Sequence, residues 1–297
     1  DVLDMTGGTG NIGLGSGSLG TALTTGTDNV AIGEASLDAV TSGTDNTAVG
    51  DNAGGAITTG TTSVAIGSAA LLLATTGARN VAVGYQALDA ATTADNNTAI
   101  GAEALGANTS GTQNVAVGTY TLDANTTANN NTGMGYNALT ANSTGATNTA
   151  IGASALGANT TASNNTAVGA DALKVNTTGT QNVGVGALAL DANTTADKNT
   201  AIGYGSLTGN STGEENTSLG ANSLVGNTTA DSNTAIGSSS LEQNSTGASN
   251  VAVGRRALYA NSTASNNTAV GYHSLYANTT GTENTAVGNN ALDANTT

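Results

Sequence analysis

The side chains that carry most enzyme chemistry are scarce in this chain and do not converge. The 297 residues include a single histidine, His273, and no cysteine. His273 falls at a turn position of the repeat described below, where we expect it to be solvated and without a cysteine or carboxylate partner. General acid–base and nucleophilic catalysis need groups of different types that converge. We therefore expect a protein that is not an enzyme.

The acidic residues do not follow a pattern for metal binding. Calcium-binding β-rolls carry a glycine-rich nonapeptide with repeated aspartates, and that motif is absent from this sequence. We expect neither a metal site nor a cofactor.

One local cluster of basic and aromatic residues stands out. Arg255 and Arg256 are the one adjacent basic pair, and Tyr259, Tyr272 and Tyr276 follow them closely. The pattern favours ordinary variation of turn residues. The alternative is a surface contact, with the arginines meeting an anionic glycan or a neighbouring carboxylate and the tyrosines stacking on carbohydrate.

Overall charge argues against nucleic acid as a partner. The chain has 20 acidic and 5 basic residues, for a net charge of −15. Binding to nucleic acid draws on a basic stripe that releases counterions. No such stripe is present, and the longest apolar run is too short to insert into a membrane.

The composition does not suit a conventional globular core. Phe, Trp, Pro and Cys are absent, and the chain contains 42 glycines. Alanine supplies much of the apolar fraction and buries little area per residue. The aliphatic residues are nevertheless regularly spaced, which indicates order by stacking of repeats.

Glycine recurs every 17 residues in 16 copies that align without gaps. A degenerate copy precedes them and contains one extra residue. We therefore divide the chain into residues 1–28, a degenerate first coil or N-terminal cap, and residues 29–297, a regular solenoid whose last copy is truncated. The first glycines of the regular series are Gly33, Gly50, Gly67, Gly84, Gly101 and Gly118.

The repeat unit predicts short strands joined by turns. In the unit that runs from Asn165 to Gln181, NTAVGADALKVNTTGTQ, Asn165 is position 1, Val168 position 4, Gly169 position 5 and Leu173 position 9. Positions 2–4 and 8–10 fit two short strands, and no segment has helical periodicity. We expect an all-β protein, a β-solenoid or β-roll of stacked 17-residue coils.

Alternation along the strand predicts two restricted surfaces, because neighbouring side chains face opposite ways. Position 4 is aliphatic or Met, and position 3 is Ala, Gly or Ser in every regular copy. We expect position 4 and the leucine at position 9 to fill the coil, and the alanine column to pack against another copy in a trimer or filament. The alternative places the alanines inside and position 4 against a neighbour.

Two further patterns concern the stacking of coils. Asparagine at position 1 and, from Asn108, at position 12 suits ladders of amide hydrogen bonds between coils. Position 15 alternates between Gly and Ala from Gly77 onward, a 34-residue period. Either a two-coil unit was duplicated, or one full turn takes 34 residues.

The paired Thr and Ser residues at positions 13 and 14 point to opposite sides and leave one outward column per coil. Such a column admits an ice-binding or mineral-binding surface, although a single column weakens that hypothesis. Segments such as Asn125-Thr126-Thr127 and Asn176-Thr177-Thr178 match the N-glycosylation acceptor pattern, but the match follows from the repeat itself.

The segments Asn97 to Leu105 and Asn284 to Leu292, with the pattern Asn-Thr-Ala-Val/Ile-Gly-x-x-Ala/Ser-Leu, resemble the head repeats of trimeric autotransporter adhesins. They also resemble repeats of phage tail-fibre proteins. The resemblance covers almost the whole chain and implies a left-handed β-roll, often trimeric, that projects from a surface and contacts a host or matrix. The 17-residue unit is longer than the usual adhesin-head coil.

From this resemblance and the repeat, we predict a structural fibre or filament protein, located outside the cell on a cell surface or virion. Its expected partner is itself, through the alanine column or the coil ends. The alternatives are an adhesin that binds host-surface glycan or matrix through the solenoid surface, and an ice-binding solenoid.

Overall fold

The computed structural model describes residues 9–297, which contain 17 three-residue strands and no helix. Residues 1–8, part of the predicted N-terminal cap, lie outside the described residues. Contacts divide the chain into two units, residues 1–147 and residues 148–297. The first unit contains β1 (Ile12–Leu14), β2 (Val30–Ile32), β3 (Thr47–Val49), β4 (Val64–Ile66), β5 (Val81–Val83), β6 (Thr98–Ile100), β7 (Val115–Val117) and β8 (Thr132–Met134). The second contains β9 (Thr149–Ile151), β10 (Thr166–Val168), β11 (Val183–Val185), β12 (Thr200–Ile202), β13 (Thr217–Leu219), β14 (Thr234–Ile236), β15 (Val251–Val253), β16 (Thr268–Val270) and β17 (Thr285–Val287).

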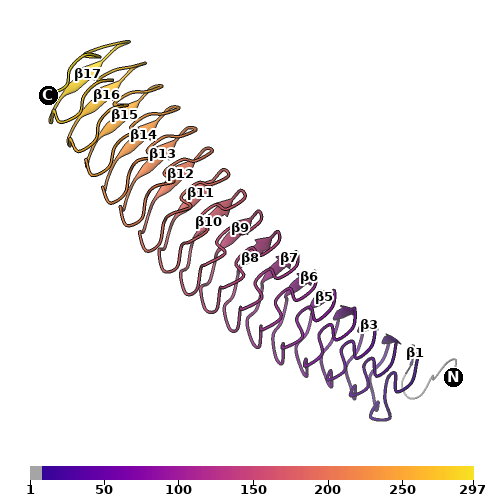
Figure 1. Cartoon of the computed structure of the whole chain (residues 1–297). Coiled ribbons are helices and arrows are strands. Elements are labelled where there is room, and N and C mark those ends of the chain that lie inside the picture. The colour runs from indigo at the N-terminus through magenta and orange to yellow at the C-terminus, as the bar shows by residue number, and fades with distance from the viewer. Residues whose placement is uncertain (1–8) are drawn as a thin grey trace. The chain divides into compact units, whose positions relative to one another are not determined.

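Each unit is a parallel β-solenoid with one strand per coil (Figure 1). Thr166 pairs with Val183, so equivalent residues 17 apart lie side by side. The predicted solenoid of 17-residue coils is confirmed. The 34-residue turn is wrong, because every printed pairing from β2 onward within a unit joins neighbouring coils.

The first coil is longer by one residue, as its sequence indicates. Ile12 pairs with Val30, a spacing of 18, whereas the Thr24 N–H donates to the Thr41 carbonyl at a spacing of 17. The extra residue therefore lies between Leu19 and Thr24. Strand pairing absorbs it without a break, because it falls in a turn.

The second strand predicted at positions 8–10 is absent from the described residues, which form turns there. The leucine at position 9 has a positive φ, 51° at Leu173 and 54° at Leu190. A left-handed leucine costs about 1–2 kcal/mol. Full burial of its side chain offsets that cost by about 1.5–3 kcal/mol. The second strand fails because the chain must bend here to turn this leucine inward.

The coil interior holds the alanine column, not position 4. Ala167, Ala201 and Ala235 at position 3 are completely buried, as are Leu173 and Leu207 at position 9. Each strand from β2 onward is buried only at its middle residue. The predicted contact between alanine columns of two copies is therefore wrong, and the alternative assignment is the one observed. A three-residue strand beside a turn leaves room inside for only a methyl group, so the larger residues face out.

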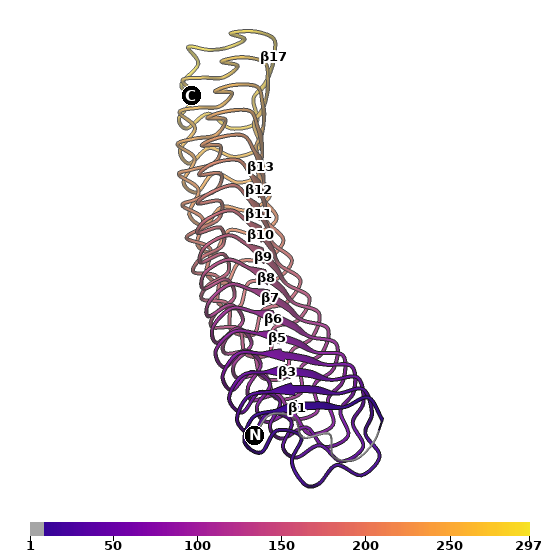
Figure 2. The same cartoon turned by 90° about the vertical axis from the view of Figure 1, so that its right-hand side faces the viewer.

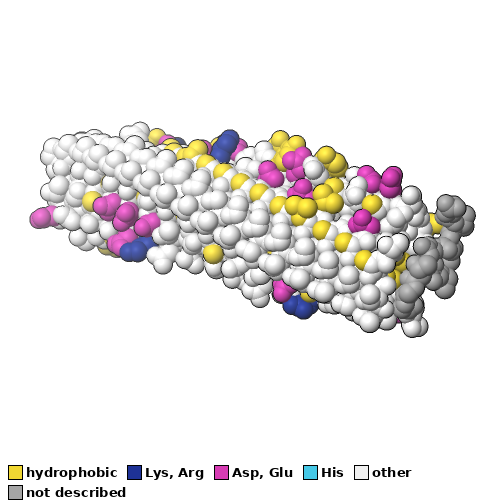
Figure 3. Space-filling view, turned by 90° about the horizontal axis from the view of Figure 1, so that it is seen from below, with side chains coloured by type: hydrophobic (Ala, Val, Ile, Leu, Met, Phe, Trp, Pro, Cys, Tyr) yellow, Lys and Arg dark blue, Asp and Glu magenta, His cyan; other side chains and the backbone are white. Residues whose placement is uncertain are grey.

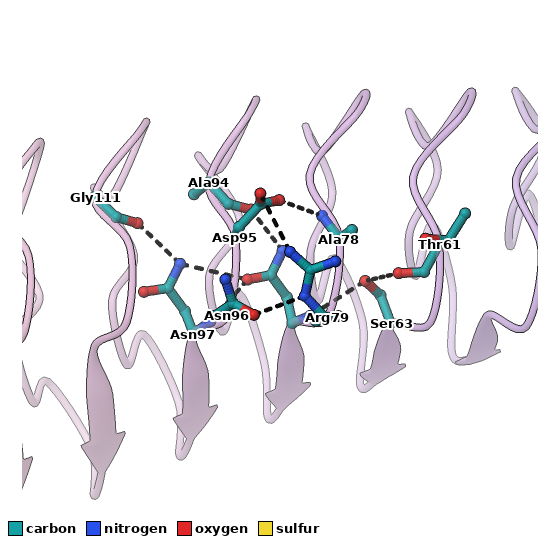
Figure 4. A network of polar contacts seen from close by, with 10 residues as sticks. Thr61, Ser63, Ala78, Arg79, Ala94, Asp95, Asn96, Asn97 and Gly111 are labelled. Carbon is teal, nitrogen blue, oxygen red and sulfur yellow. Dashed lines mark hydrogen bonds and ion pairs between the residues drawn. The ribbon is translucent and has the colours of Figure 1, made fainter.

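Two buried asparagine ladders connect the coils. The Asn165 N–H donates to Asn148 Oδ1 at 2.9 Å, and Asn165 Nδ2 donates to the Gly179 carbonyl at 2.8 Å. Asn176 at position 12 donates to Asn159 Oδ1 at 3.1 Å. Figure 4 shows the position-1 ladder near Ser63 and Asn97, and Figure 2 shows the stacked coils from the side. Both predicted ladders are present, inside the coil.

Before Asn108 the position-12 corner is apolar instead. Val40, Ile57, Ala74 and Ala91 are buried there. In one coil Gly54 replaces the position-9 leucine, and a Cβ added to Gly54 would lie 3.0 Å from Ile57 Cδ1. Ile57 therefore fills the space that the missing leucine leaves.

Candidate functional site

The glycines at position 5 bring neighbouring coils into close contact. At Gly33, Gly50, Gly67, Gly84, Gly101 and Gly118 the φ angle lies between 129° and 137°, and at Gly169 it is 139°. A Cβ added to Gly84 would lie 2.6 Å from the Gly101 carbonyl oxygen. Both the backbone conformation and the approach of the next coil therefore require glycine. The column serves the stack and offers no reactive group.

The outer side of the strands forms a surface that we call the strand face, defined as positions 2 and 4 of every coil. Position 2 is Val or Thr, and position 4 is Val, Ile, Leu or Met, in all regular copies. Val168 is half-buried, while Ile202 and Ile236 are 38% and 36% exposed. No charged side chain occurs in the strand face of residues 29–297. Each unit thus presents an uncharged, largely aliphatic ladder to solvent.

Charged side chains are confined to a second surface, the loop edge, defined as positions 6, 7, 10, 16 and 17. Every acidic and basic residue of positions 9–297 falls at one of these five positions. Three ion pairs form within the described part: Arg79 with Asp95, Lys174 with Asp171, and Lys198 with Glu215. Figure 3 shows charged side chains in separate groups and hydrophobic ones recurring in rows.

Burial raises the pKa of two aspartates of the loop edge, both at position 10. Desolvation is the main cause at Asp89 and at Asp123, and the neighbouring Glu103 carboxylate adds to it. Both carboxylates therefore hold their protons to a higher pH than a solvated aspartate.

The Thr and Ser residues of positions 13 and 14 differ in exposure. The Thr177 hydroxyl donates to the Thr194 carbonyl of the next coil at 3.1 Å, which fixes its side chain. Position 14 is exposed in every regular coil from Ser42 to Thr280. The prediction of one free outward column per coil fits this arrangement.

The glycosylation acceptor pattern lies in the coil interior. Asn125 and Asn176 are completely buried, and their amides donate to Asn108 Oδ1 and Asn159 Oδ1. An amide nitrogen held in this ladder is not accessible to a modifying enzyme in the folded coil.

Arg255, Arg256, Tyr259, Tyr272, His273 and Tyr276 gather at the loop edge of three successive strands, β15 to β17, and we call them the aromatic–arginine cluster. Tyr259 and Tyr276 stack at 5.2 Å between ring centroids. Arg255 lies 5.8 Å from the Tyr272 ring centroid, and Arg256 lies 5.5 Å from that of Tyr259. The structure thus brings together all five residues that the sequence singles out as a surface contact.

His273 belongs to this cluster, which the sequence reasoning missed. Its ring stacks on Tyr272 at 3.9 Å and on Tyr276 at 4.6 Å between centroids. Nε2 is buried and has no hydrogen-bond partner within residues 9–297. The prediction of a solvated turn residue is wrong. Its position 7, next to Tyr272 at position 6 and one turn before Tyr276 at position 10, was the signal.

Comparison with known proteins gives no family: no protein-family model and no curated protein matches this chain. Within residues 9–297, the His, Asp and Glu side chains form no group of three that could hold a metal ion. The same part of the chain has no helix that could span a bilayer.

Proposed function

We propose that this chain is a structural component of an extracellular fibre or filament, and that copies associate laterally through the strand face. The observation that carries the proposal is the absence of charge and of large polar residues from positions 2 and 4 in all 16 regular copies. These side chains point outward, so the packing of the coil does not require them to be apolar.

The size of the strand face fits a contact with another protein surface. At about 4.8 Å per coil and about 10 Å per strand, the nine strands of the second unit present roughly 430 Å². Contiguous apolar patches of a few hundred Å² on soluble proteins mark interaction sites. The repeat of this surface in every coil favours a partner with the same repeat.

Charge favours a second copy of this chain, docked through this face. A net charge of −15 makes two copies repel each other wherever their loop edges meet. The strand face carries no charge, so two copies can approach there at the least electrostatic cost. Burial of Ile202, Ile236 and their neighbours then stabilises the contact.

The experiment compares two triple variants by mass in solution over a range of protein concentrations. Val168→Glu, Ile202→Glu and Ile236→Glu place three carboxylates on the strand face. We expect the concentration at half-assembly to rise at least about tenfold, because like charges at an interface are costly. Since all three sites face solvent, the coil itself should keep its circular dichroism spectrum.

The matched control adds the same charge to the loop edge with Ala170→Glu, Ala221→Glu and Ser238→Glu, all at exposed position-6 sites. This variant should assemble within about threefold of the original protein. Equal weakening by both variants would show a general charge effect and contradict the proposal, as would a monomer at every concentration of the original protein.

Location outside the cell rests on the resemblance to adhesin-head and tail-fibre repeats. Antibodies raised against the purified chain should label the surface of intact cells or particles of its source in electron micrographs. Labelling only after the cells are opened would contradict this part of the proposal.

A second candidate function, ice or mineral binding, is favoured by the position-14 column. Exposed Thr or Ser hydroxyls recur there at about 4.8 Å, and each donates and accepts hydrogen bonds. We expect thermal hysteresis that is lost in Thr161→Lys with Thr195→Lys. Absence of hysteresis in the original protein would exclude ice binding.

A further inference from the structure

The aromatic–arginine cluster departs from the rest of the solenoid at the same positions. It holds three of the seven tyrosines, the single histidine and two of the five basic residues within 22 residues, Arg255 to Tyr276. The coil before it has Ser238 and Ser239 at positions 6 and 7, and the coil after it has Asn289 and Asn290. Packing of the coil therefore does not demand large side chains there.

Stacking fixes the rings of this cluster as a rigid aromatic surface. The Tyr272 and His273 rings lie within 8° of parallel, and so do those of Tyr259 and Tyr276. His273 lies against both Tyr272 and Tyr276, so it holds the two pairs together. Tyr272 remains 43% exposed. A flat, exposed aromatic ring is the surface on which the apolar C–H face of a sugar packs.

The two arginines supply positive charge that no carboxylate neutralises. Neither Arg255 nor Arg256 forms an ion pair with any residue of the described chain, unlike Arg79, Lys174 and Lys198. Each guanidinium lies over a tyrosine ring, which orients it and leaves its N–H groups for a ligand. A planar guanidinium binds a carboxylate through two parallel hydrogen bonds.

We propose that the aromatic–arginine cluster binds an oligosaccharide that carries a single carboxylate, with the sugar rings on Tyr272 and the carboxylate at Arg255 or Arg256. The rest of the chain limits the charge of the ligand. A net charge of −15 repels long polyanions, so a sparsely charged saccharide is favoured over a sulfated polymer or a nucleic acid. This binding is independent of the strand face.

The test is calorimetric titration of the purified full chain with sialyllactose, with lactose as the uncharged probe. We expect sialyllactose to bind at least tenfold more tightly than lactose. Arg255→Gln with Arg256→Gln should remove that difference, and Tyr272→Ala should weaken both sugars at least fivefold. Arg79→Gln is the matched control, since it removes an arginine of another coil, and it should leave binding unchanged.

Several results would overturn the proposal. They are an absence of sialyllactose binding, equal binding of lactose and sialyllactose, and binding that survives Arg255→Gln with Arg256→Gln. Tighter binding of a heparin fragment or of oligo-deoxythymidine would instead assign the cluster to a polyanion. Because all variants lie at the loop edge, circular dichroism and the mass in solution should not change, which separates this test from that of lateral association.

Discussion

The strand face and the loop edge are both outward surfaces of the same coils, yet they differ in how freely their residues vary. Position 6 of the loop edge holds Glu34, Ser68, Tyr85, Ala102 and Arg255 in different coils. Position 4 of the strand face admits only Val, Ile, Leu or Met. Both surfaces lie on a backbone with the same turns and the same strand register.

This difference separates what the fold requires from what the fold leaves open. Alanine at position 3, leucine at position 9 and asparagine at position 1 are fixed by their burial inside the coil. Positions 2 and 4 face out, so the interior does not account for their uniform apolar character. The loop edge shows how an outward position varies when nothing covers it. The contrast points to a partner on the strand face.

The largest effect should come from breaking the ladder beneath the strand face. Asn199 Oδ1 accepts from the Asn216 N–H at 2.9 Å, and Asn199 Nδ2 donates to the Gly213 carbonyl at 2.8 Å. Asn199→Ala leaves both groups buried without partners, which should cost about 2–5 kcal/mol in urea unfolding. Asn289→Ala, at the loop edge, should change stability by less than about 0.5 kcal/mol. Similar losses in both variants would mean that the ladder adds nothing.

A next, smaller effect concerns the volume beneath the strand. Ala201→Leu adds three carbons to a fully buried site and should cost about 1–3 kcal/mol. Ala221→Leu adds the same atoms to an exposed loop-edge site and should be nearly neutral. Thermal unfolding of the two variants compares them directly, and equal melting temperatures would contradict the inward assignment of position 3.

Ser63 is the one departure from asparagine at position 1 of the regular coils, and it provides a gain-of-stability test. The Asn80 N–H donates to Ser63 Oγ at 3.3 Å, a longer bond than elsewhere in the ladder. Ser63→Asn should restore the amide ladder and stabilise the chain by about 0.5–1.5 kcal/mol. Urea unfolding that shows a loss would indicate that this coil is too narrow for asparagine.

The smallest effect concerns pH at the loop edge. Burial raises the pKa of Asp89 and Asp123 in the folded chain above the ordinary value. The folded state therefore binds these protons more tightly, and the stabilisation they give is full below the unfolded pKa and is lost as the pH rises through the folded pKa. Asp89→Asn should stabilise the protein at pH 7 by less than about 1 kcal/mol. The gain should vanish near pH 3, and a gain that is equal at both pH values would contradict the account.

Much of this arrangement could be predicted from the sequence, because stacking repeats the same environment in every coil. The spacing of Gly33, Gly50 and Gly67 predicted the coil length, and Asn165 predicted a ladder. The inside and outside of the strand could not be assigned, since Ala167 and Val168 are both apolar and alternation does not say which faces in. The second strand was wrong because Leu173 adopts a left-handed conformation, which no residue-type preference indicates.

The aromatic–arginine cluster was predicted only as scattered residues. Arg255, Tyr259 and Tyr272 share loop-edge positions in neighbouring coils, which the repeat alone indicates. That His273 joins them depends on the direction of a side chain with a φ of 52°, which only the folded turn provides.

The rate of thiol alkylation tests the central claim most directly, because the chain contains no cysteine of its own. Ile202→Cys places a thiol on the strand face, and Ser238→Cys places one on the loop edge. Above the concentration at which the protein assembles, alkylation of Ile202→Cys should slow at least tenfold while that of Ser238→Cys stays constant. Equal rates for Ile202→Cys in dilute and assembled protein would show that the strand face remains open to solvent and would contradict lateral association through it.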